Sequence, residues 1–357
     1  GMFKSNTLPF FKKNLISFLC LFVIIFLQII KKDSILIENY YSTSFYKISS
    51  EIPLYLFGKL PFSFGDILYL TIPIILWLII KNNNTRRQNL KNIFHFIATL
   101  YIVFQFQWGL NYYRTTLKTK LSIEDKYELS SLIKVTDLFI TNTNNIHKKL
   151  SNSDTLPVLF DYKINNQLYL ESIEAIKTLE KENITNDKAP IISVKKSLYS
   201  TPLSYMGFSG YINPFTLEAQ INTNTPKIYL PTTICHEIAH QIGYSAENEA
   251  NFIGIMAAIH SKNKFFSYSG NISTLKYLLN ELYKTDKLKF DELFIKVNRG
   301  VIENINQANK QLEQYKNPLE PYFKDFYGLF LKANNQKQGI KSYNMVVSLL
   351  VNYYSSQ

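Results

Sequence analysis

The sequence predicts a mostly α-helical α+β protein, in which three N-terminal membrane-spanning helices precede a polar domain that contains a small β-sheet. Three observations lead to this prediction. Long apolar runs are confined to the first third of the 357 residues, and amphipathic and alternating stretches follow them. The chain is 46% hydrophobic, which is enough to bury a sizeable core and excludes a disordered protein. Its two cysteines exclude a disulfide-built scaffold.

Three apolar runs cover about residues 15–30, 64–80 and 93–110. A helix needs roughly 17–25 apolar residues to cross a bilayer, and each run reaches that span once its flanks are included. The first run follows basic residues but lacks a small-residue cleavage site, so we interpret it as a retained span rather than a signal peptide. Buried core helices are the alternative interpretation for all three runs.

The charge distribution predicts the orientation of these spans. The net charge is +12: residues 1–114 hold 12 basic and 4 acidic residues, and residues 115–357 hold 27 and 23. The loop at residues 81–92 has four basic residues and no acid, which is typical of a cytoplasmic loop. We therefore expect a cytoplasmic N-terminus and an extracytoplasmic domain after about Arg114. The basic excess then reports membrane topology, and a nucleic-acid partner is not expected.

Four regions are expected along the chain: a membrane domain (1–114), a helical connecting region (115–190), a core domain (191–270) and a C-terminal helical region (271–357). Periodicity predicts helices over 122–150 and 165–182, and strands over 191–197, 217–222 and 227–230. The strand at 217–222 is either an edge strand that pairs an extended peptide or a purely structural strand.

The chemistry-bearing motif is His236-Glu237-Ile-Ala-His240, within a helix expected to begin near Thr232. Histidines at i and i+4 project from one face of a helix, so both imidazoles can reach one metal ion. Glu237 stands beside them, toward the open position of that ion. Five histidines in the whole chain make an accidental match to this HExxH pattern rare. Zinc in such a site normally takes three protein ligands and a water, so a third ligand is expected.

The next acidic residues are Glu247 and Glu249. Gly243 is placed to end the motif helix, and Ser245 is placed to N-cap a second helix. On that second helix Glu247 and Asn251 share a face, whereas Glu249 lies about 200° away from Glu247. We favour Glu247 as the third ligand and Asn251 as a hydrogen-bond partner of a ligand imidazole. The alternative interpretation is that Glu247 is an ordinary acidic residue on the exposed surface of a helix.

An HExxH motif followed by a helix with the pattern E-x-x-x-N resembles the glutamate-liganded zincins. The resemblance implies a zincin-like metallopeptidase domain with an active-site helix. It implies that His236, His240 and Glu247 hold one Zn²⁺ and that Glu237 is the general base. Asn251 stands at a position that is often Asp in that group, so a negative charge near the ligands is lost here.

A second resemblance covers nearly the whole chain. It rests on five segments, at residues 60–69, 108–114, 205–222, 236–252 and 331–350. With the three spans, they resemble an uncharacterised domain-of-unknown-function family of bacterial inner-membrane proteins that carry an HExxH domain. The resemblance implies a multi-pass inner-membrane protein with a periplasmic C-terminal domain. It implies no substrate.

The expected function is that of a membrane-anchored zinc metalloprotease that hydrolyses peptide bonds on the extracytoplasmic side. Zinc lowers the pKa of its bound water to about 7, and Glu237 takes the proton of that water and returns it to the leaving amine. The expected partners are a peptide or protein substrate and the lipid bilayer. Two alternatives stay open: an inactive zinc-binding sensor or interaction module, and a zinc hydrolase of a non-peptide cell-wall amide. The oligomeric state is not predicted.

Peptide hydrolysis also needs a donor to the oxyanion. Tyr205, Tyr211, His260 and Tyr268 are the candidates, and core or helix-end positions are the alternative for each. Cys235 precedes the motif and is interpreted as a small buried residue. Cys20 lies in the first span, so the two cysteines do not pair.

Overall fold

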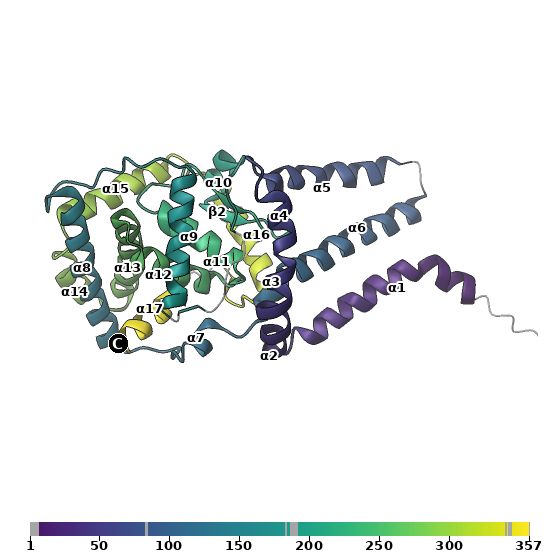
Figure 1. Cartoon of the computed structure of the whole chain (residues 1–357), viewed down its shortest axis with the longest axis horizontal. Coiled ribbons are helices and arrows are strands. Elements are labelled where there is room, and N and C mark those ends of the chain that lie inside the picture. Colours follow the sequence, from purple (N-terminus) through teal and green to yellow (C-terminus); the bar gives the residue numbers. More distant parts are fainter. Residues whose placement is uncertain are drawn as a thin grey trace, which may run out of the picture.

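The computed structural model describes residues 7–82, 85–182, 184–185, 192–339, 341 and 345–356. It is mostly helical with one three-stranded sheet, which confirms the predicted mostly α, α+β class. Figure 1 shows a helical body from which three helices project on one side. We call these helices the arm; they are α1 (Thr7–Ile30), α5 (Phe64–Lys81) and α6 (Arg86–Gln107).

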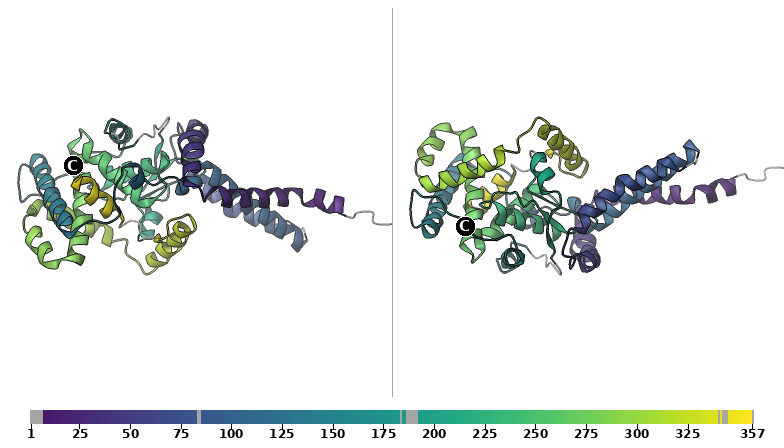
Figure 2. Two further views of the ribbon diagram at one scale, coloured as in Figure 1. Left: turned by 90° about the horizontal axis from the view of Figure 1, so that it is seen from below. Right: turned by 90° about the horizontal axis from the view of Figure 1, so that it is seen from above.

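The arm corresponds to the three predicted spans. Its helices leave the body in the same general direction in each view (Figures 1 and 2), and a 2.8 Å hydrogen bond between Ser17 and His95 joins α1 to α6. In the described part of the chain, α5 is the one single helix long and apolar enough to cross a membrane, with mean hydropathy 1.8. Helix α1 reaches that criterion only together with the helix that follows it. Three spans therefore stay a prediction.

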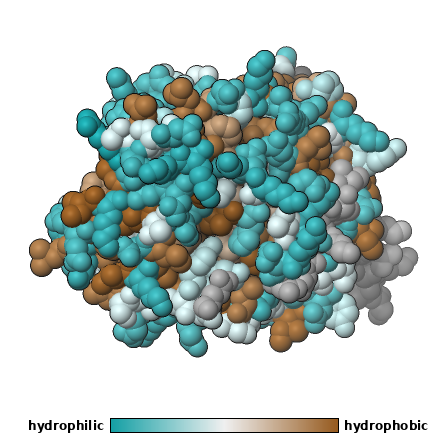
Figure 3. Space-filling model, turned by 60° about the vertical axis from the view of Figure 1, so that its left-hand side comes forward, coloured by the Kyte–Doolittle hydropathy of each residue, from teal (hydrophilic) through white to brown (hydrophobic). Residues whose placement is uncertain are grey.

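Exposed apolar side chains are most frequent on the arm. Phe22 of α1 and Trp77 of α5 are 68% and 55% exposed, and many neighbours on both helices are similarly open. The end of the body that carries α8 and α15 presents hydrophilic residues with apolar residues scattered among them (Figure 3). The arm therefore has the denser apolar surface, and separate apolar residues such as Leu288 and Ile295 are exposed on the body.

A helical stretch at residues 34–57 crosses the base of the arm (Figure 1), and we call it the platform helix. It comprises α2 (Ser34–Leu36), η1 (Ile37–Phe45), α3 (Tyr46–Ser49) and α4 (Glu51–Phe57). It is bent by 101° from α1. One face, with Ile37 and Leu54, is buried, and another, with Ile48 and Ile52, is exposed. Both faces are apolar.

The body confirms the two predicted amphipathic helices as α8 (Leu129–Ser151) and α9 (Asn166–Lys181). Helix α8 begins later than residue 122 because Ser122 has a positive φ of 54°, which a helix does not tolerate. The other body helices are η2 (Gly109–Tyr113), α7 (Leu117–Lys120), α10 (Ser200–Met206), α11 (Leu230–Gln241), α12 (Glu247–His260), α13 (Lys264–Thr285), α14 (Lys287–Phe294), α15 (Arg299–Glu313), α16 (Glu320–Ala333) and α17 (Val346–Ser355).

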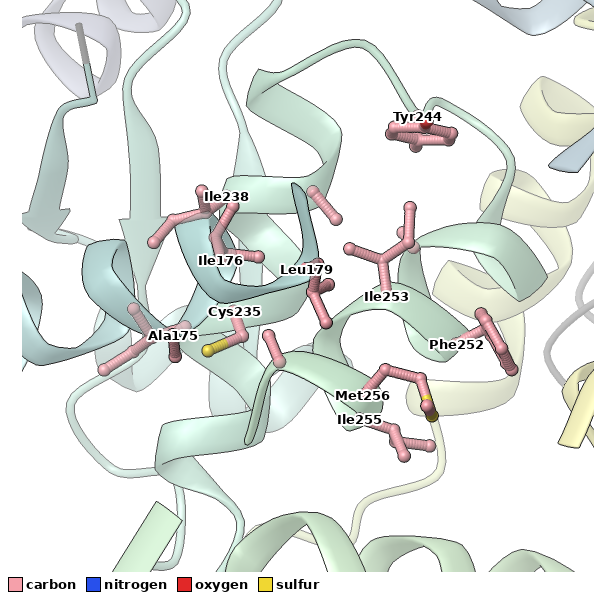
Figure 4. Packing of buried hydrophobic residues seen from close by; sticks show 14 of the residues in the cluster. Ala175, Ile176, Leu179, Cys235, Ile238, Tyr244, Phe252, Ile253, Ile255 and Met256 are labelled. Atoms are coloured by element: carbon pink, nitrogen blue, oxygen red, sulfur yellow. The ribbon is translucent and has the colours of Figure 1, made fainter. Parts of the chain in front are cut away.

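The core around the motif is formed by α9, α11 and α12. Figure 4 shows Ile176 and Leu179 of α9 facing Ile238 of α11 and Ile253 of α12. Cys235 is fully buried in this cluster, and burial raises the pKa of its thiol, as expected for a small core residue. The core therefore holds α11 by the face that lies opposite to its two histidines.

The sheet consists of β1 (Val194–Lys196), β3 (Ala219–Ile221) and β2 (Gly210–Ile212), in the order β1-β3-β2. Strand β3 is parallel to β1 and antiparallel to β2. Of the two interpretations of the strand at 217–222, the edge strand is wrong, because β3 is paired on both sides, and the purely structural strand is the one that the sheet contains. The predicted strand at 227–230 is also wrong: Tyr229 N donates to Pro226 O, which forms a turn into α11.

The outer strands of the sheet are β1 and β2. The predicted strand at 191–197 shortens to β1, with residue 191 outside the described residues. Strand β2 falls in a turn-rich aromatic stretch that has no alternating pattern, so the sequence did not predict it.

Buried acids join the arm to the sheet. Glu218 is fully buried and accepts hydrogen bonds from Phe64 N (3.2 Å) and Gly65 N (2.6 Å) at the start of α5. A carboxylate at a helix N-terminus is favoured by the unpaired amides and the helix dipole. Asp66, also fully buried, accepts from Leu198 N at 2.6 Å. The arm therefore continues directly into the body.

Candidate metal centre

Helices α11 and α12 carry the HExxH motif and the acids that follow it. Helix α11 has a proline in its first turn, where no backbone donor is needed. It ends before Gly243, whose φ of +105° fits the predicted helix stop. The predicted N-cap is wrong: Ala246 precedes α12, and the buried Ser245 hydroxyl has no hydrogen-bond partner.

A glycine allows α12 to lie against α11. A Cβ at Gly254 would stand 2.7 Å from His236 N and 2.9 Å from His236 Cα. Glu247, Asn251 and Gly254 are at i, i+4 and i+7, so they share one face of α12. The close approach at Gly254 therefore directs Glu247 toward the motif.

Three ligand-type side chains converge where the helices meet. His236 Nε2 and His240 Nε2 lie 3.4 Å and 3.5 Å from Glu247 Oε2. The three possible ligand atoms lie within 4.8 Å of one another. Two ligands each about 2.0–2.1 Å from a tetrahedral zinc are about 3.4 Å apart, so this spacing fits one such ion.

Hydrogen bonds orient two of these side chains. His240 Nδ1 lies 2.8 Å from Tyr244 O, and donation of its proton to that carbonyl leaves the Nε2 lone pair directed at Glu247. Tyr327 Oη donates to Glu247 Oε1 at 2.6 Å, and the other carboxylate oxygen faces the histidines. His236 Nδ1 and Glu247 Oε2 are buried without hydrogen-bond partners. Unsatisfied buried polar atoms are costly, and an ion between Glu247 Oε2 and the two histidine Nε2 atoms would give that oxygen a partner.

Glu237 and Glu247 are both buried, but their pKa values are shifted in opposite directions. Burial raises the pKa of Glu237 to about 7, against the opposing effect of His236 and His240. Burial also acts to raise the pKa of Glu247, but the two histidines beside its carboxylate outweigh that effect and hold the pKa far below its usual value. Glu247 is therefore an ionised acceptor, while Glu237 is able to exchange a proton near neutrality.

The structure separates Glu247 from Glu249. Glu249 Oε1 accepts from Leu117 N at 2.7 Å, at the start of α7 on another side of α12. Asn251 lines a cavity beside the motif, and its Nδ2 is buried without a partner. Its predicted hydrogen bond to a ligand imidazole is not formed; the Tyr244 carbonyl orients His240 instead.

A cavity of about 580 Å³ opens beside His236 and Glu237. Its walls come from the Gly207–Gly210 segment, α11, α12 and α13. A Cβ at Gly210 would stand 2.7 Å from Glu237 Oε1, so the start of β2 lies directly against this carboxylate. A larger cavity of about 840 Å³ near residues 58–62 holds none of the candidate ligands.

The four candidate oxyanion donors do not line this cavity. Each has another contact: Tyr205 with the Tyr315 ring, Tyr211 Oη with Asp66, His260 Nδ1 with Met256 O and Tyr268 Oη with Asn304. Tyr277 of α13 does line it, and burial, helped by the charge of Glu247, raises its pKa to about 12. Sequence reasoning missed Tyr277 because nothing local distinguishes it among 25 tyrosines.

Comparison with known families places the chain. The family described as "Protein of unknown function (DUF3810)" matches residues 41–351, which is most of the sequence. The chain belongs to the DUF3810 family. This confirms the predicted resemblance to an uncharacterised family. No curated protein and no solved structure matches the chain.

In this DUF3810 protein, side chains beside the arm cap the C-terminal end of α11. Trp108 Nε1 donates to His240 O at 2.9 Å, and Tyr46 Oη donates to Gln241 O at 2.6 Å. The last carbonyls of a helix have no partner within the helix, so these bonds satisfy them. The position of His240 therefore depends on residues of the platform helix and of the segment after α6.

Arg114 completes this cap. Its guanidinium donates to Gly243 O at 3.1 Å and lies 4.7 Å from the centre of the Tyr244 ring. Two bonds of 2.9 Å join it to the Glu38 carboxylate, which also pairs with Lys120. Burial acts to raise the pKa of Glu38, but these cations hold it below its usual value. The loop between α11 and α12 is thus fixed by an ion pair.

Proposed function

We propose that this DUF3810 protein is a membrane-anchored, zinc-dependent peptidase that works on the extracytoplasmic side of a bacterial inner membrane. The observation that carries the proposal is the buried cluster of His236, His240 and Glu247 with Glu237 beside it on a cavity wall. Two imidazoles and one carboxylate are a common donor set for catalytic zinc.

The donor set favours a catalytic zinc over a structural one. Structural zinc sites are closed by four protein ligands, whereas catalytic sites have three and an open position. Within the described ranges, the cluster has three members, and no fourth His, Cys, Asp or Glu joins it. Glu237, a group suited to proton transfer, lies beside the cluster on the cavity wall. A closed structural site does not need such a group. This argues against an inactive zinc-binding module.

The chain's own residues supply the remaining steps of amide hydrolysis. Zinc held by the three ligands would act as a Lewis acid toward the scissile carbonyl and the attacking water. Glu237 accepts the proton of that water and then delivers it to the leaving amine. The Tyr277 hydroxyl, which makes no hydrogen bond to the described residues, is a donor in the cavity suited to the oxyanion, as is the unpartnered hydroxyl of Tyr229.

The sheet favours a peptide over a non-peptide amide. Strand β2 is an outer strand that pairs with β3 on one side, and Gly210 at its start lies against Glu237. An extended peptide can add to an outer strand through backbone hydrogen bonds. A peptide laid along β2 would pass its backbone in front of the proposed general base.

The arm and the platform helix support the membrane location. The helices of the arm expose apolar side chains, and the basic residues Lys81, Arg86 and Arg87 lie at its far end from the body (Figure 1). That arrangement suits a positive cytoplasmic loop and an extracytoplasmic body. The platform helix lies across the arm and exposes Tyr40 and Ile48, by 74% and 72%, which suits a helix at the membrane surface.

The peptidase proposal is tested on the full-length protein in detergent. Metal analysis should give about one zinc per chain. Glu237→Gln should keep the zinc and lower cleavage of a peptide library by at least about 100-fold, because general acid–base catalysis contributes that much. Glu303→Gln, at an exposed position on α15, is the matched control and should cleave normally. Absence of zinc, or unchanged cleavage by Glu237→Gln, would contradict the proposal.

The orientation is tested separately with C-terminal fusions. Alkaline phosphatase fused after residue 357 should be active, because its disulfides form only outside the cytoplasm. An inactive phosphatase fusion together with a fluorescent cytoplasmic reporter at the same site would place the body in the cytoplasm and overturn the orientation.

A further inference from the structure

The cavity beside the candidate metal ligands is lined by more lysines than acids. Helix α13 contributes Lys276, Asn280 and Lys284 to its wall, at i, i+4 and i+8, so one face of that helix is directed at the cavity. Lys324 of α16 and Lys341 also line it. A volume of about 580 Å³ is typical of a site for a small ligand or a short peptide segment.

The acids around the cavity do not neutralise these lysines. Besides Glu237, the lining contains one acid, Glu281, which accepts a hydrogen bond from Tyr127 Oη at 3.2 Å. Lys324 is already paired with Glu320. Lys276 forms no ion pair with any residue that the structure describes. The wall provided by α13 therefore has cationic charge left for a ligand.

Lys276 is the most sheltered of these cations. It is half-buried, and its ammonium lies 4.9 Å from the centre of the Tyr229 ring, which also lines the cavity. Burial lowers its pKa. A half-buried ammonium without a carboxylate partner is costly to maintain, and an anion entering the cavity would remove that cost.

We propose that the cavity binds peptides with a carboxylate close to the scissile bond, and that the Lys276 ammonium is the partner of that carboxylate. The inference rests on the proposed peptidase function, because His236 and Glu237 line the same cavity. Two sources supply this chemistry: an acidic side chain near the cleaved bond, or the C-terminal carboxylate of the peptide. The side chain of Lys276 is then a determinant of specificity.

The experiment measures binding of four phosphinic peptides to the zinc-loaded, full-length protein by calorimetry. Phosphinic peptides span both sides of the scissile position and are not cleaved. The reference peptide has Gln on both sides and an amidated C-terminus. One variant has Glu on the N-terminal side, one has Glu on the C-terminal side, and one has a free C-terminal carboxylate.

At least one carboxylate peptide should bind about 10- to 100-fold more tightly than the reference, the range for a charge-assisted hydrogen bond away from bulk water. The peptide that gains identifies the source of the carboxylate. Lys276→Met, which keeps the aliphatic stem, should abolish this preference and leave the affinity for the reference and the zinc content unchanged. Lys264→Met removes the same charge from an exposed site on α13 and should keep the preference.

The outcomes separate the two proposals. If the reference peptide binds but no carboxylate peptide binds more tightly, the specificity proposal fails and the zinc site stands. If the preference survives in Lys276→Met with normal zinc content, Lys276 is not the partner and the specificity proposal also fails. If the wild type binds neither zinc nor the reference peptide, the peptidase proposal fails, and the inference built on it fails too.

Discussion

The C-terminal end of α11 and the side of α11 that faces the cavity differ in how their polar groups are hydrogen-bonded. At the end near the arm, Trp108, Tyr46 and Arg114 donate to the backbone carbonyls of residues 240, 241 and 243. Glu38 neutralises the guanidinium. On the cavity side, polar atoms of His236, Glu237, Glu247 and Asn251 are buried without partners. In the first region the backbone carbonyls are bonded within the chain, and in the second the ligand-type side chains are arranged for something the chain does not provide.

This difference indicates that one end of α11 holds the helix in place, while the cavity side carries the groups proposed for chemistry. The bonded end fixes the helix that carries the histidines and so helps to set the spacing of the ligand atoms. Under the proposed function, an ion and a substrate would supply partners to the unsatisfied atoms of the cavity. Substitutions at the two regions should therefore have different signatures: loss of metal or ligand binding at the cavity, and loss of stability at the bonded end.

The largest expected effect comes from the cavity side. Glu247→Gln removes a proposed ligand and should weaken zinc binding by more than about 100-fold, beyond the loss expected for an outer hydrogen-bonding partner. Glu249→Gln is the matched control, since Glu249 bonds Leu117 N and lies away from the histidines. Competition with a chelator of known affinity measures both. Equal zinc affinity in the two variants, or a greater loss in Glu249→Gln, would overturn the choice of ligand.

The second prediction tests whether a wider spacing between α11 and α12 is enough to weaken zinc binding at the cavity. Gly254→Ala places a methyl group 2.7 Å from His236 N, so α12 must move away and the protein should lose about 3 kcal/mol of stability. Zinc affinity should fall by at least about 10-fold, because Glu247 moves with α12. Chemical unfolding and chelator competition measure the two effects.

Gly270→Ala is the control for Gly254→Ala. Its methyl group would stand 2.8 Å from Ile259, where α13 crosses α12 away from the histidines. It should destabilise the protein to a similar degree while zinc affinity changes little. If both variants lose zinc equally, the site depends on overall stability rather than on the crossing at Gly254.

The parts of this site that follow from local geometry could be predicted from the sequence. The turn of a helix fixes which residues share a face, so His236 and His240 were grouped from their spacing alone. The same rule selected Glu247 over Glu249, and these are the side chains that the structure brings together. The helix stop at Gly243 likewise depends on one residue's backbone.

The parts that depend on long-range packing could not be predicted. Tyr277 and Lys276 reach the cavity because α13 packs on α12, and their local sequence has no mark of that contact. Strand β2 is three residues long and exists because β3 pairs with it. The bonds from Trp108 and Tyr46 link residues more than a hundred positions apart, so no sequence pattern indicates them.

The third prediction concerns the bonded end and its dependence on pH. Glu38→Gln leaves the buried Arg114 without its charged partner and should lower the stability by about 2 kcal/mol at pH 7. Because the folded pKa of Glu38 is held below its usual value of 4.5, this stability is present above about pH 4.5 and is lost as pH falls through the folded pKa. The stabilities of the wild type and the variant should therefore approach each other as the pH falls below 4.5. A difference that stays constant throughout the acid range would show that the carboxylate charge contributes nothing.

The smallest expected effect is that of a single hydroxyl at the same end. Tyr46→Phe removes the donor to Gln241 O and retains the ring, so about 1 kcal/mol of stability should be lost. Tyr41→Phe is a suitable control, since that hydroxyl donates to Phe106 O at 3.0 Å and does not contact α11. Zinc affinity should fall slightly in Tyr46→Phe and stay constant in Tyr41→Phe, because only the first bond holds the helix that carries His240. Equal zinc affinity in both variants, with the expected loss of stability, would mean that the bonded end supports the fold without positioning the metal ligands.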